Sequence, residues 1–449
     1  GHVKSIYESE EGCMKIKIID FGPIKEFEFD LSKKLIVTYG DNNIGKSYAM
    51  QVVYLLLKAF QDFPTEEMTS MLLRFSKFIE KMQKEKTSDG IKSDDKATEQ
   101  EVDISNAMLN VVMQKFMTSC RNTFGNLDVT LSKKPHIYAE VDEYRLDIDM
   151  EKETMSYCKG SIKYAWGITY NNDTPPEMIE TYTKDDILSA VKKEISHVYF
   201  LPASRSGIYS GMSAFGTIVA ELSKNRSALT SKIELPGISE PISDYFIELS
   251  NISNNSTVDT AVDKELKACY DKIEELILGG HVIFDGNKKS LMYVPDDMDI
   301  QFSMTEVSSM VSEVSPIVAF LKYIVANRQN VGSESRAVLF IEEPEAHLHP
   351  NNQVKLMEIF TELTNAGITL VMSSHSNYVF NKLNNLVLSG KLDYNIYQPI
   401  YLEKGAEGSI SKPMHIDECG ADDENFIDVS EALYNEREQI IQEHNEGAE

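Results

Sequence analysis

The most constraining feature of the sequence is a loop with two glycines, residues 40–47, which has the sequence GDNNIGKS. An apolar stretch before it, residues 34–39, predicts a buried strand, and residues 47–60 after it predict a helix. Backbone N–H groups in such a loop, together with the N-terminus of the helix, bind phosphates. The sequence therefore predicts the start of an α/β sheet that holds the phosphates of a nucleotide. The residues expected to bind them are Gly40, Asn42, Asn43, Gly45, Lys46 and Ser47.

Two side chains of this loop have separate expected roles. Lys46 would neutralise the outer phosphates, and Ser47 would place its hydroxyl on Mg²⁺. The alternative is an incidental glycine turn. The buried strand before the loop and the helix after it favour phosphate binding.

A second apolar strand, residues 338–341, ends in two adjacent carboxylates, Glu342 and Glu343. In P-loop nucleotidases a strand beside the P-loop strand ends in an acid, because Mg²⁺ needs hard oxygen ligands next to the phosphates. Glu342 is expected to hold the metal, and Glu343 to polarise the water that attacks the γ-phosphate. The alternative is a pair of solvated acids at the end of a strand.

Histidines follow both this strand and a third apolar strand. Residues 368–374 predict the third strand, and His375 after it is expected to contact the γ-phosphate or the water, unless local hydrogen bonds satisfy it. His347 and His349 are two residues apart and could share a zinc ion, but only Glu345 lies near them as a further ligand. A zinc site is therefore not expected there.

Composition limits the class of protein. The net charge of −27 weighs against a surface that binds nucleic acid throughout, although it leaves room for a local basic patch. The five cysteines form no CxxC pair, which favours free thiols in a reducing cytoplasm. No apolar run is long enough to span a bilayer, so we expect a cytoplasmic protein without a membrane partner.

Periodicity predicts the domain organisation. Apolar residues recur at helical spacing in residues 66–86 and 99–123, which predicts an inserted helical hairpin. Alternation predicts strands in residues 15–31, 136–150 and 154–163. The expected units are a core lobe of residues 12–60, 126–200 and 335–415, a hairpin insertion of residues 61–125, a helical lobe of residues 201–334 and an acidic C-terminal tail of residues 416–449.

Four stretches resemble the ABC-type ATPases of the SMC, RecF and OLD group. They are Ile19–Ile24 (IDFGPI), the P-loop with Asn42, Ile341–Pro350 (IEEPEAHLHP) and Ser373–Ser376 (SSHS). In that group the last three are the Walker A motif, the Walker B motif with its D-loop, and the H-loop. The resemblance implies an ABC-type head of class α/β, with a mixed sheet, a P-loop core and a helical lobe. It also implies ATP and Mg²⁺ as cofactors and a homo-oligomer, at least a dimer, with ATP between subunits.

Two departures from the pattern bear on activity. Most members of the group have Asp where this chain has Glu342, so the resemblance implies an ATPase with slow turnover. No LSGGQ signature is present, and the nearest equivalent is Thr305–Glu313, before a helix expected at Ile317–Asn327. There Ser308 or Ser309 would cap a helix that points at the nucleotide of another subunit, or would simply be an N-cap. No Q-loop glutamine is assigned.

Within the group, the chain most resembles the standalone ATPases of bacterial anti-phage operons, such as the ATPase subunits of the PARIS and Septu systems. Leu201–Gly207 (LPASRSG) is similar to a strand and loop of these relatives, and its Arg205 could face phosphate or form a structural salt bridge. The resemblance implies a sensor or scaffold that controls a separate effector, a nuclease, with a phage-encoded trigger. Residues 376–449 are too few for the Toprim nuclease domain of OLD nucleases. The alternatives are a DNA-repair or chromosome-maintenance ATPase that binds DNA, and a pseudo-ATPase, which Glu343 and His375 disfavour.

Overall fold

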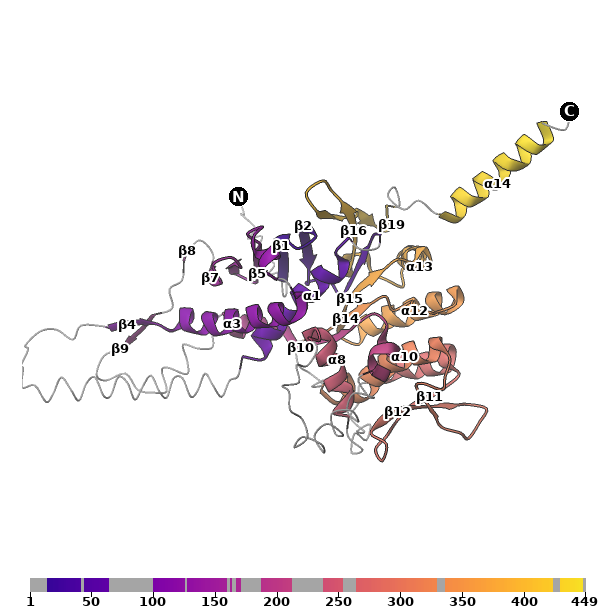
Figure 1. Ribbon diagram of the computed structural model, residues 1–449, viewed down its shortest axis with the longest axis horizontal. Helices are drawn as coiled ribbons and strands as arrows, with labels where there is room; N and C mark the ends of the chain where they lie inside the picture. The colour runs from indigo at the N-terminus through magenta and orange to yellow at the C-terminus, as the bar shows by residue number, and fades with distance from the viewer. Residues whose placement is uncertain are drawn as a thin grey trace, which may run out of the picture.

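A mixed sheet of twelve strands forms the centre of the molecule (Figure 1). Its strand order is β10-β14-β15-β3-β16-β17-β2-β1-β5-β6-β7-β8. The expected α/β class with a mixed sheet is therefore confirmed. The computed structural model describes residues 14–41, 44–63, 100–125, 127–159, 162–163, 167–170, 187–211, 237–252, 264–328, 336–422 and 429–446.

One half of the sheet is parallel and the other half is mainly antiparallel. The parallel strands are β10 (Ile195–Leu201), β14 (Arg336–Glu342), β15 (Ile368–Ser374), β3 (Leu35–Tyr39) and β16 (Tyr397–Lys404). The remaining strands are β17 (Ser409–Pro413), β2 (Ile24–Asp30), β1 (Met14–Phe21), β5 (His136–Val141), β6 (Tyr144–Asp149), β7 (Thr154–Lys159) and β8 (Ile162–Lys163), all paired antiparallel except β17 with β2.

The strand order corrects one expectation. The strand that ends in the two glutamates was expected beside the P-loop strand, but β15 lies between β14 and β3 and pairs with both. Since parallel neighbours end at the same edge of a sheet, the three strands bring Glu342, His375 and the P-loop to one place.

Successive residues of these strands enter two different cores, because side chains alternate between the faces of a sheet. In β14, Val338 and Phe340 pack on one face, and Leu339 and Ile341 on the other. Burial on both faces explains the continuous apolar runs in the sequence. Each large apolar side chain buried there contributes about 1.5–3 kcal/mol.

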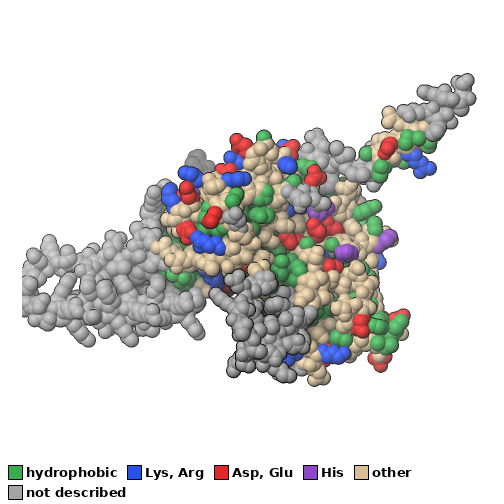
Figure 2. Space-filling model, in the orientation of Figure 1, with side chains coloured by type: hydrophobic (Ala, Val, Ile, Leu, Met, Phe, Trp, Pro, Cys, Tyr) green, Lys and Arg blue, Asp and Glu red, His purple; other side chains and the backbone are tan. Residues whose placement is uncertain are grey.

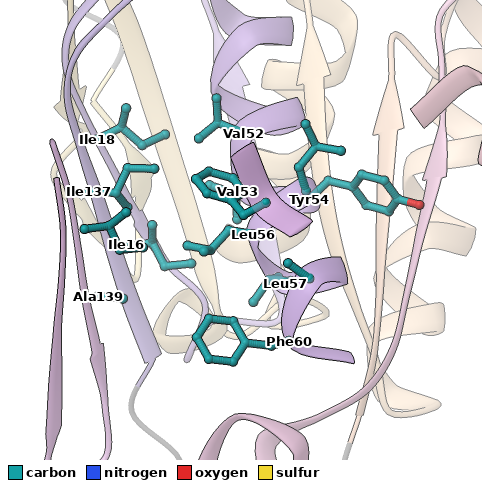
Figure 3. Close-up of a cluster of buried hydrophobic side chains, with 14 of the residues drawn as sticks. Ile16, Ile18, Val52, Val53, Tyr54, Leu56, Leu57, Phe60, Ile137 and Ala139 are labelled. Atoms are coloured by element: carbon teal, nitrogen blue, oxygen red, sulfur yellow. The ribbon is translucent and has the colours of Figure 1, made fainter. Parts of the chain in front are cut away.

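The first face is covered by the helix that follows the P-loop. Figure 3 shows side chains of α1 (Lys46–Gln61), such as Val53 and Leu56, against Ile16 and Ile18 of β1 and against β5. Helix α1 buries eleven of its sixteen residues, so it fixes the P-loop to the sheet. The other helices of this face are α3 (Ile104–Phe124), α4 (Leu127–Leu131) and α6 (Ile187–Glu194).

The second face carries α12 (Pro350–Asn365), α13 (Asn377–Leu388) and the lobe expected to be helical. That lobe also contains a three-stranded sheet, which the sequence reasoning missed. Its elements are α8 (Glu240–Ser250), α9 (Lys264–Ile273), the π-helix η3 (Glu274–Leu278), β11 (Gly280–Asp285), β12 (Ser290–Pro295), β13 (Phe302–Ser303), α10 (Ser309–Ala319), the π-helix η4 (Phe320–Val325) and α11 (Ala326–Arg328).

The expected hairpin is described only in its second half. Helix α3 matches the second predicted helix, and its buried residues belong to the same core as those of α1. Residues 66–86, the first predicted helix, lie outside the described residues. Before α3, the strand β4 (Gln100–Asp103) pairs with β9 (Gly167–Tyr170), a segment not expected there.

The C-terminal segment forms two short strands and a helix. After η5 (Tyr394–Ile396) and β16, the chain forms β18 (Ile416–Asp417) and β19 (Gly420–Ala421). Helix α14 (Val429–Glu446) extends away from the body, and residues 432–442 are exposed (Figure 1). No helix in the described part of the chain is both long enough and apolar enough to span a bilayer.

Candidate functional site

A pocket of about 840 Å³ lies at the carboxyl ends of β3, β15 and β14. Side chains far apart in the sequence meet in it, because the three strands end at the same edge. It holds the P-loop residues together with Glu343 and His375, as the sequence predicts. The lining residues are Pro23, Ile44, Gly45, Lys46, Ser47, Tyr48, Glu343, Ser373 and His375.

The backbone of the P-loop requires glycine at two positions. Gly45 has φ +105° at the N-cap of α1, and a Cβ there would lie 3.0 Å from Pro23 Cγ. A Cβ on Gly40 would lie 2.6 Å from the carbonyl oxygen of Leu402. Positive φ and close backbone approach both disfavour any side chain. The turn of the β1–β2 hairpin thus packs on the loop through Pro23, while Asn42 and Asn43 lie outside the described residues.

Lys46 is a buried residue of the pocket lining. Its Nζ donates to the carbonyl oxygens of Gly40 and Asp41, each at 2.6 Å, and lies 3.3 Å from His375 Nδ1. Burial lowers the pKa of Lys46 to about 8, although the negative charges of Glu343 and Asp41 act to raise it. No other Lys or Arg is among the described residues that line the pocket.

The lowered pKa of Lys46 predicts a pH-dependent affinity for phosphate ligands. Below pH 8 the amine carries its charge, and above pH 8 the free protein loses it. The affinity for ATP should therefore fall by up to about tenfold per pH unit above 8, while ATP itself keeps a constant charge there. Titration of a fluorescent ATP analogue at pH 7, 8 and 9 measures this.

The matched control for this titration is Lys46→Arg, whose guanidinium stays charged over the whole range. The affinity of the Lys46→Arg protein for the ATP analogue should stay constant between pH 7 and 9. A flat wild-type profile up to pH 9 would refute the role of the Lys46 charge.

Glu343 and His375 form a hydrogen-bonded pair at the mouth of the pocket. His375 Nε2 lies 2.9 Å from Glu343 Oε1, and this hydrogen bond lowers the pKa of Glu343. His375 Nδ1 lies 3.1 Å from the Gly40 carbonyl oxygen. A proton on Nε2 makes this nitrogen the donor to the Glu343 carboxylate. The glutamate is thus an ionised acceptor at neutral pH, as a base that receives a proton from water must be.

The backbone of Glu343 is strained. Its φ is +44°, a left-handed conformation that is uncommon for residues other than glycine. Its N–H donates to the Ser373 carbonyl oxygen at 3.1 Å, which ties the residue to β15. Strained backbone of this kind persists only where the surroundings fix it, and it is concentrated at functional sites.

Glu342 and Ser47 fit the expected metal site. Burial raises the pKa of Glu342, and the nearby Ser47 hydroxyl and the Ala203 N–H partly offset that rise. Glu342 Oε2 accepts from Ala203 N at 3.1 Å, whereas its Oε1 has no hydrogen-bond partner among the described residues. A buried carboxylate oxygen without a partner beside a hydroxyl suits Mg²⁺, which is held by one or two carboxylates together with substrate phosphates.

The segment after the two glutamates anchors the His375 loop. Glu345 Oε1 accepts from the Ser374 hydroxyl at 2.6 Å and from His375 N at 3.0 Å. Sequence reasoning placed Glu345 only beside a rejected zinc site and missed this contact between β14 and β15. His349 caps α12, since its Nδ1 accepts from Asn351 N at 3.3 Å. No group of three or more metal-binding side chains is present among the residues described.

Ser308 and Ser309 lie outside this pocket. Ser308 is the N-cap of α10 and accepts from Val311 N, and both serines are exposed. The helix begins eight residues before the predicted Ile317 and runs through Pro316. Residues Val311–Ala319 of α10 are buried, so tertiary packing outweighs the poor helix propensity of the proline. The two serines are free to face a neighbouring molecule.

Arg205 does not face the pocket. Its side chain is fully buried and bonds to backbone carbonyls and to Glu313, so of the two alternatives the structure shows the salt bridge.

One family of known proteins matches most of this chain. The model of the AAA ATPase domain family matches residues 14–380. No curated protein matches the chain.

The solved structures similar to the chain include three Smc heads. The SMC head domain from Thermotoga maritima is 8% identical, with a TM-score of 0.38, over 90% of this chain and 99% of that chain. A Smc head bound to the C-winged helix domain of ScpA is 10% identical, with a TM-score of 0.37, over 90% and 98%. A Smc head with an extended coiled coil, bound to the C-terminal domain of ScpA derived from Pyrococcus furiosus, is 12% identical, with a TM-score of 0.36, over 95% and 99%.

Proposed function

Because this chain belongs to the AAA ATPase domain family, we propose that it binds ATP with Mg²⁺ in the pocket at the ends of β3, β15 and β14, and hydrolyses it. One observation carries the proposal: Lys46, Ser47, Glu343 and His375 line this pocket together, and Glu342 lies buried beside Ser47. A phosphate-binding lysine, a buried acid and an acid–histidine pair supply what phosphoryl transfer to water requires.

Each residue has a role that its contacts suggest. The phosphates replace the Gly40 and Asp41 carbonyls as partners of Lys46 Nζ. Ser47 and Glu342 would hold Mg²⁺, which would neutralise charge on the phosphates. Glu343 accepts the proton of the attacking water, and the His375 Nε2–H keeps the Glu343 carboxylate oriented. Glu342 is longer than the usual Asp at that position, which supports slow turnover.

We also propose that two subunits share each ATP. The exposed N-terminus of α10, with Ser308 and Ser309, would contact the γ-phosphate of a nucleotide on the partner subunit, since backbone N–H groups at a helix N-terminus favour anions. ATP binding then joins the subunits and hydrolysis releases them.

Mixing two inactive variants tests the shared site. Lys46→Ala removes the phosphate lysine, and Ser309→Arg blocks the α10 N-terminus, so each protein alone should be inactive. An equimolar mixture should regain roughly one quarter of the wild-type ATPase rate, because half of the dimers are mixed and each mixed dimer holds one complete site. A mixture that stays as inactive as its components would contradict the shared site.

For the biological role, we propose the sensor or scaffold subunit of a cytoplasmic anti-phage defence complex that holds and releases a separate nuclease on a phage-encoded trigger. The support is the sequence resemblance to the ATPases of such operons, above all in Leu201–Gly207. Direct DNA repair is disfavoured by the net charge of −27, and Lys and Arg lie among Asp and Glu on the face shown in Figure 2.

The experiment that tests this role is phage challenge of cells that express the chain together with its genomic neighbours. Protection by the wild-type chain that Lys46→Ala abolishes is the expected result. Tight binding of the purified chain to DNA at physiological salt, without protection, would instead support the DNA-repair role.

A further inference from the structure

Arg205 is the largest fully buried side chain among the described residues, and it lies directly behind the two acids of the site. Its Nη1 donates to the carbonyl oxygen of Glu342 at 2.7 Å, and its Nη2 to that of Glu343 at 3.2 Å. A third hydrogen bond runs from Nη1 to the Pro202 carbonyl oxygen at 3.1 Å. One guanidinium therefore binds the backbone carbonyls of both Glu342 and Glu343 at the end of β14.

Glu313 of α10 compensates the buried charge of Arg205. Its Oε2 accepts from Arg205 N at 3.0 Å and lies 3.5 Å from Nη2, and its carbonyl oxygen accepts from Arg205 Nε at 3.0 Å. Its Oε1 accepts from the N–H and the hydroxyl of Ser206 at 3.2 and 2.9 Å. Both charges are 2% exposed or less, so each would be left unpaired if the other were removed.

The contacts of Arg205 explain how the strained backbone at Glu343 is maintained. The guanidinium fixes the carbonyl of Glu343 on one side, and the bond from Glu343 N to Ser373 O fixes its N–H on the other. A residue with φ +44° needs such support, and its conformation decides where the carboxylate meets His375. Glu313, in turn, is in the second turn of α10, whose first residue follows Ser308.

We propose that Arg205 is a positioning residue for hydrolysis: it sets the Glu343 carboxylate against the attacking water and, through Glu313, ties it to the N-terminus of α10. This rests on the proposed ATPase function. If α10 moves when it contacts the ATP of a partner subunit, Glu313 moves with it, and the contact from Glu313 to Arg205 passes that movement to the backbone of Glu343. Arg205 is not among the described residues that line the pocket, so it acts through Glu343.

Arg205→Lys is the main test. A lysine keeps the charge, but its single ammonium cannot reproduce the planar fork that reaches both carbonyls and Glu313. The expected result is a kcat about 10- to 100-fold lower, since small misplacements of a reacting group have effects of this size, with the Kd for ATP within about twofold of wild type. A kcat equal to that of wild type in a folded protein would overturn the proposal.

A double variant separates positioning from a general loss of structure. If Arg205 acts through Glu343, adding Arg205→Lys to Glu343→Gln should not lower the residual rate further, because residues that act as a unit are not additive. Full additivity of the two effects would overturn the proposal.

The matched control is Lys322→Met, which removes a partly buried cation of the same lobe, bonded to Glu274 Oε1 at 3.1 Å and to the Val282 carbonyl oxygen at 3.2 Å. It should lower the melting temperature and leave kcat unchanged. If Arg205→Lys does not fold, Glu313→Gln takes its place, with kcat expected several-fold lower at unchanged Kd, and an unchanged kcat would again overturn the proposal. An inactive wild-type chain would instead refute the ATPase function itself.

Discussion

Lys46→Ala is expected to weaken ATP binding strongly and, with it, to lower ATP hydrolysis. Lys46 is the one cation among the described residues lining the pocket, and its burial makes its interaction with phosphate strong. Removing one member of such a charge pair costs about 2–5 kcal/mol, which is at least roughly 30-fold in Kd. Titration with a fluorescent ATP analogue and a phosphate-release assay measure both effects.

The control for Lys46→Ala is Lys58→Ala on the same helix, where the amine pairs with Asp62 at the surface, 3.6 Å away. It should bind and hydrolyse ATP as the wild type does. A Lys46→Ala protein that hydrolyses ATP at the wild-type rate would refute the assignment of the P-loop.

Glu343→Gln is expected to separate binding from hydrolysis. The amide keeps the size of the side chain and an oxygen for the His375 Nε2–H, but it cannot take a proton from water. A general base contributes about 10²- to 10⁴-fold, so the rate should fall by that factor while ATP stays bound. The trapped ATP should hold the protein as a dimer in size-exclusion chromatography with light scattering.

Glu358→Gln is the matched control, because Glu358 forms a surface ion pair with Lys382 on α13. It should hydrolyse ATP normally and form no trapped dimer. A Glu343→Gln protein that is strictly monomeric in saturating ATP would contradict the shared site, and one with the wild-type rate would contradict the role of Glu343 as base.

Local pattern predicted the parts of this site that a single segment determines. The strand, loop and helix around Gly45 follow from an apolar run, glycines and helical spacing, and the structure has them at nearly the predicted positions. The acids after β14 and the histidine after β15 were likewise visible as polar residues at the ends of buried strands. Whether they bind ATP and Mg²⁺ remains a prediction.

Tertiary contacts determined what the sequence could not show. The position of β15 between β14 and β3 depends on pairing of segments far apart in the chain, and apolar periodicity does not encode strand order. The bond between Arg205 and Glu313 spans 108 residues, so nothing near either residue marks it. The sheet of β11, β12 and β13 was not predicted, because it lies within residues 201–334, where the flanking segments indicate helices.

The most direct test of the account is the identity of the nucleotide that stays on the protein after incubation with Mg·ATP and rapid removal of free ligand. We expect wild type to retain a mixture of ATP and ADP, Glu343→Gln to retain ATP alone, and Lys46→Ala to retain neither. Two results would contradict the claim that these residues form one ATPase site. One is nucleotide retained by Lys46→Ala, and the other is ADP formed by Glu343→Gln as fast as by the wild type.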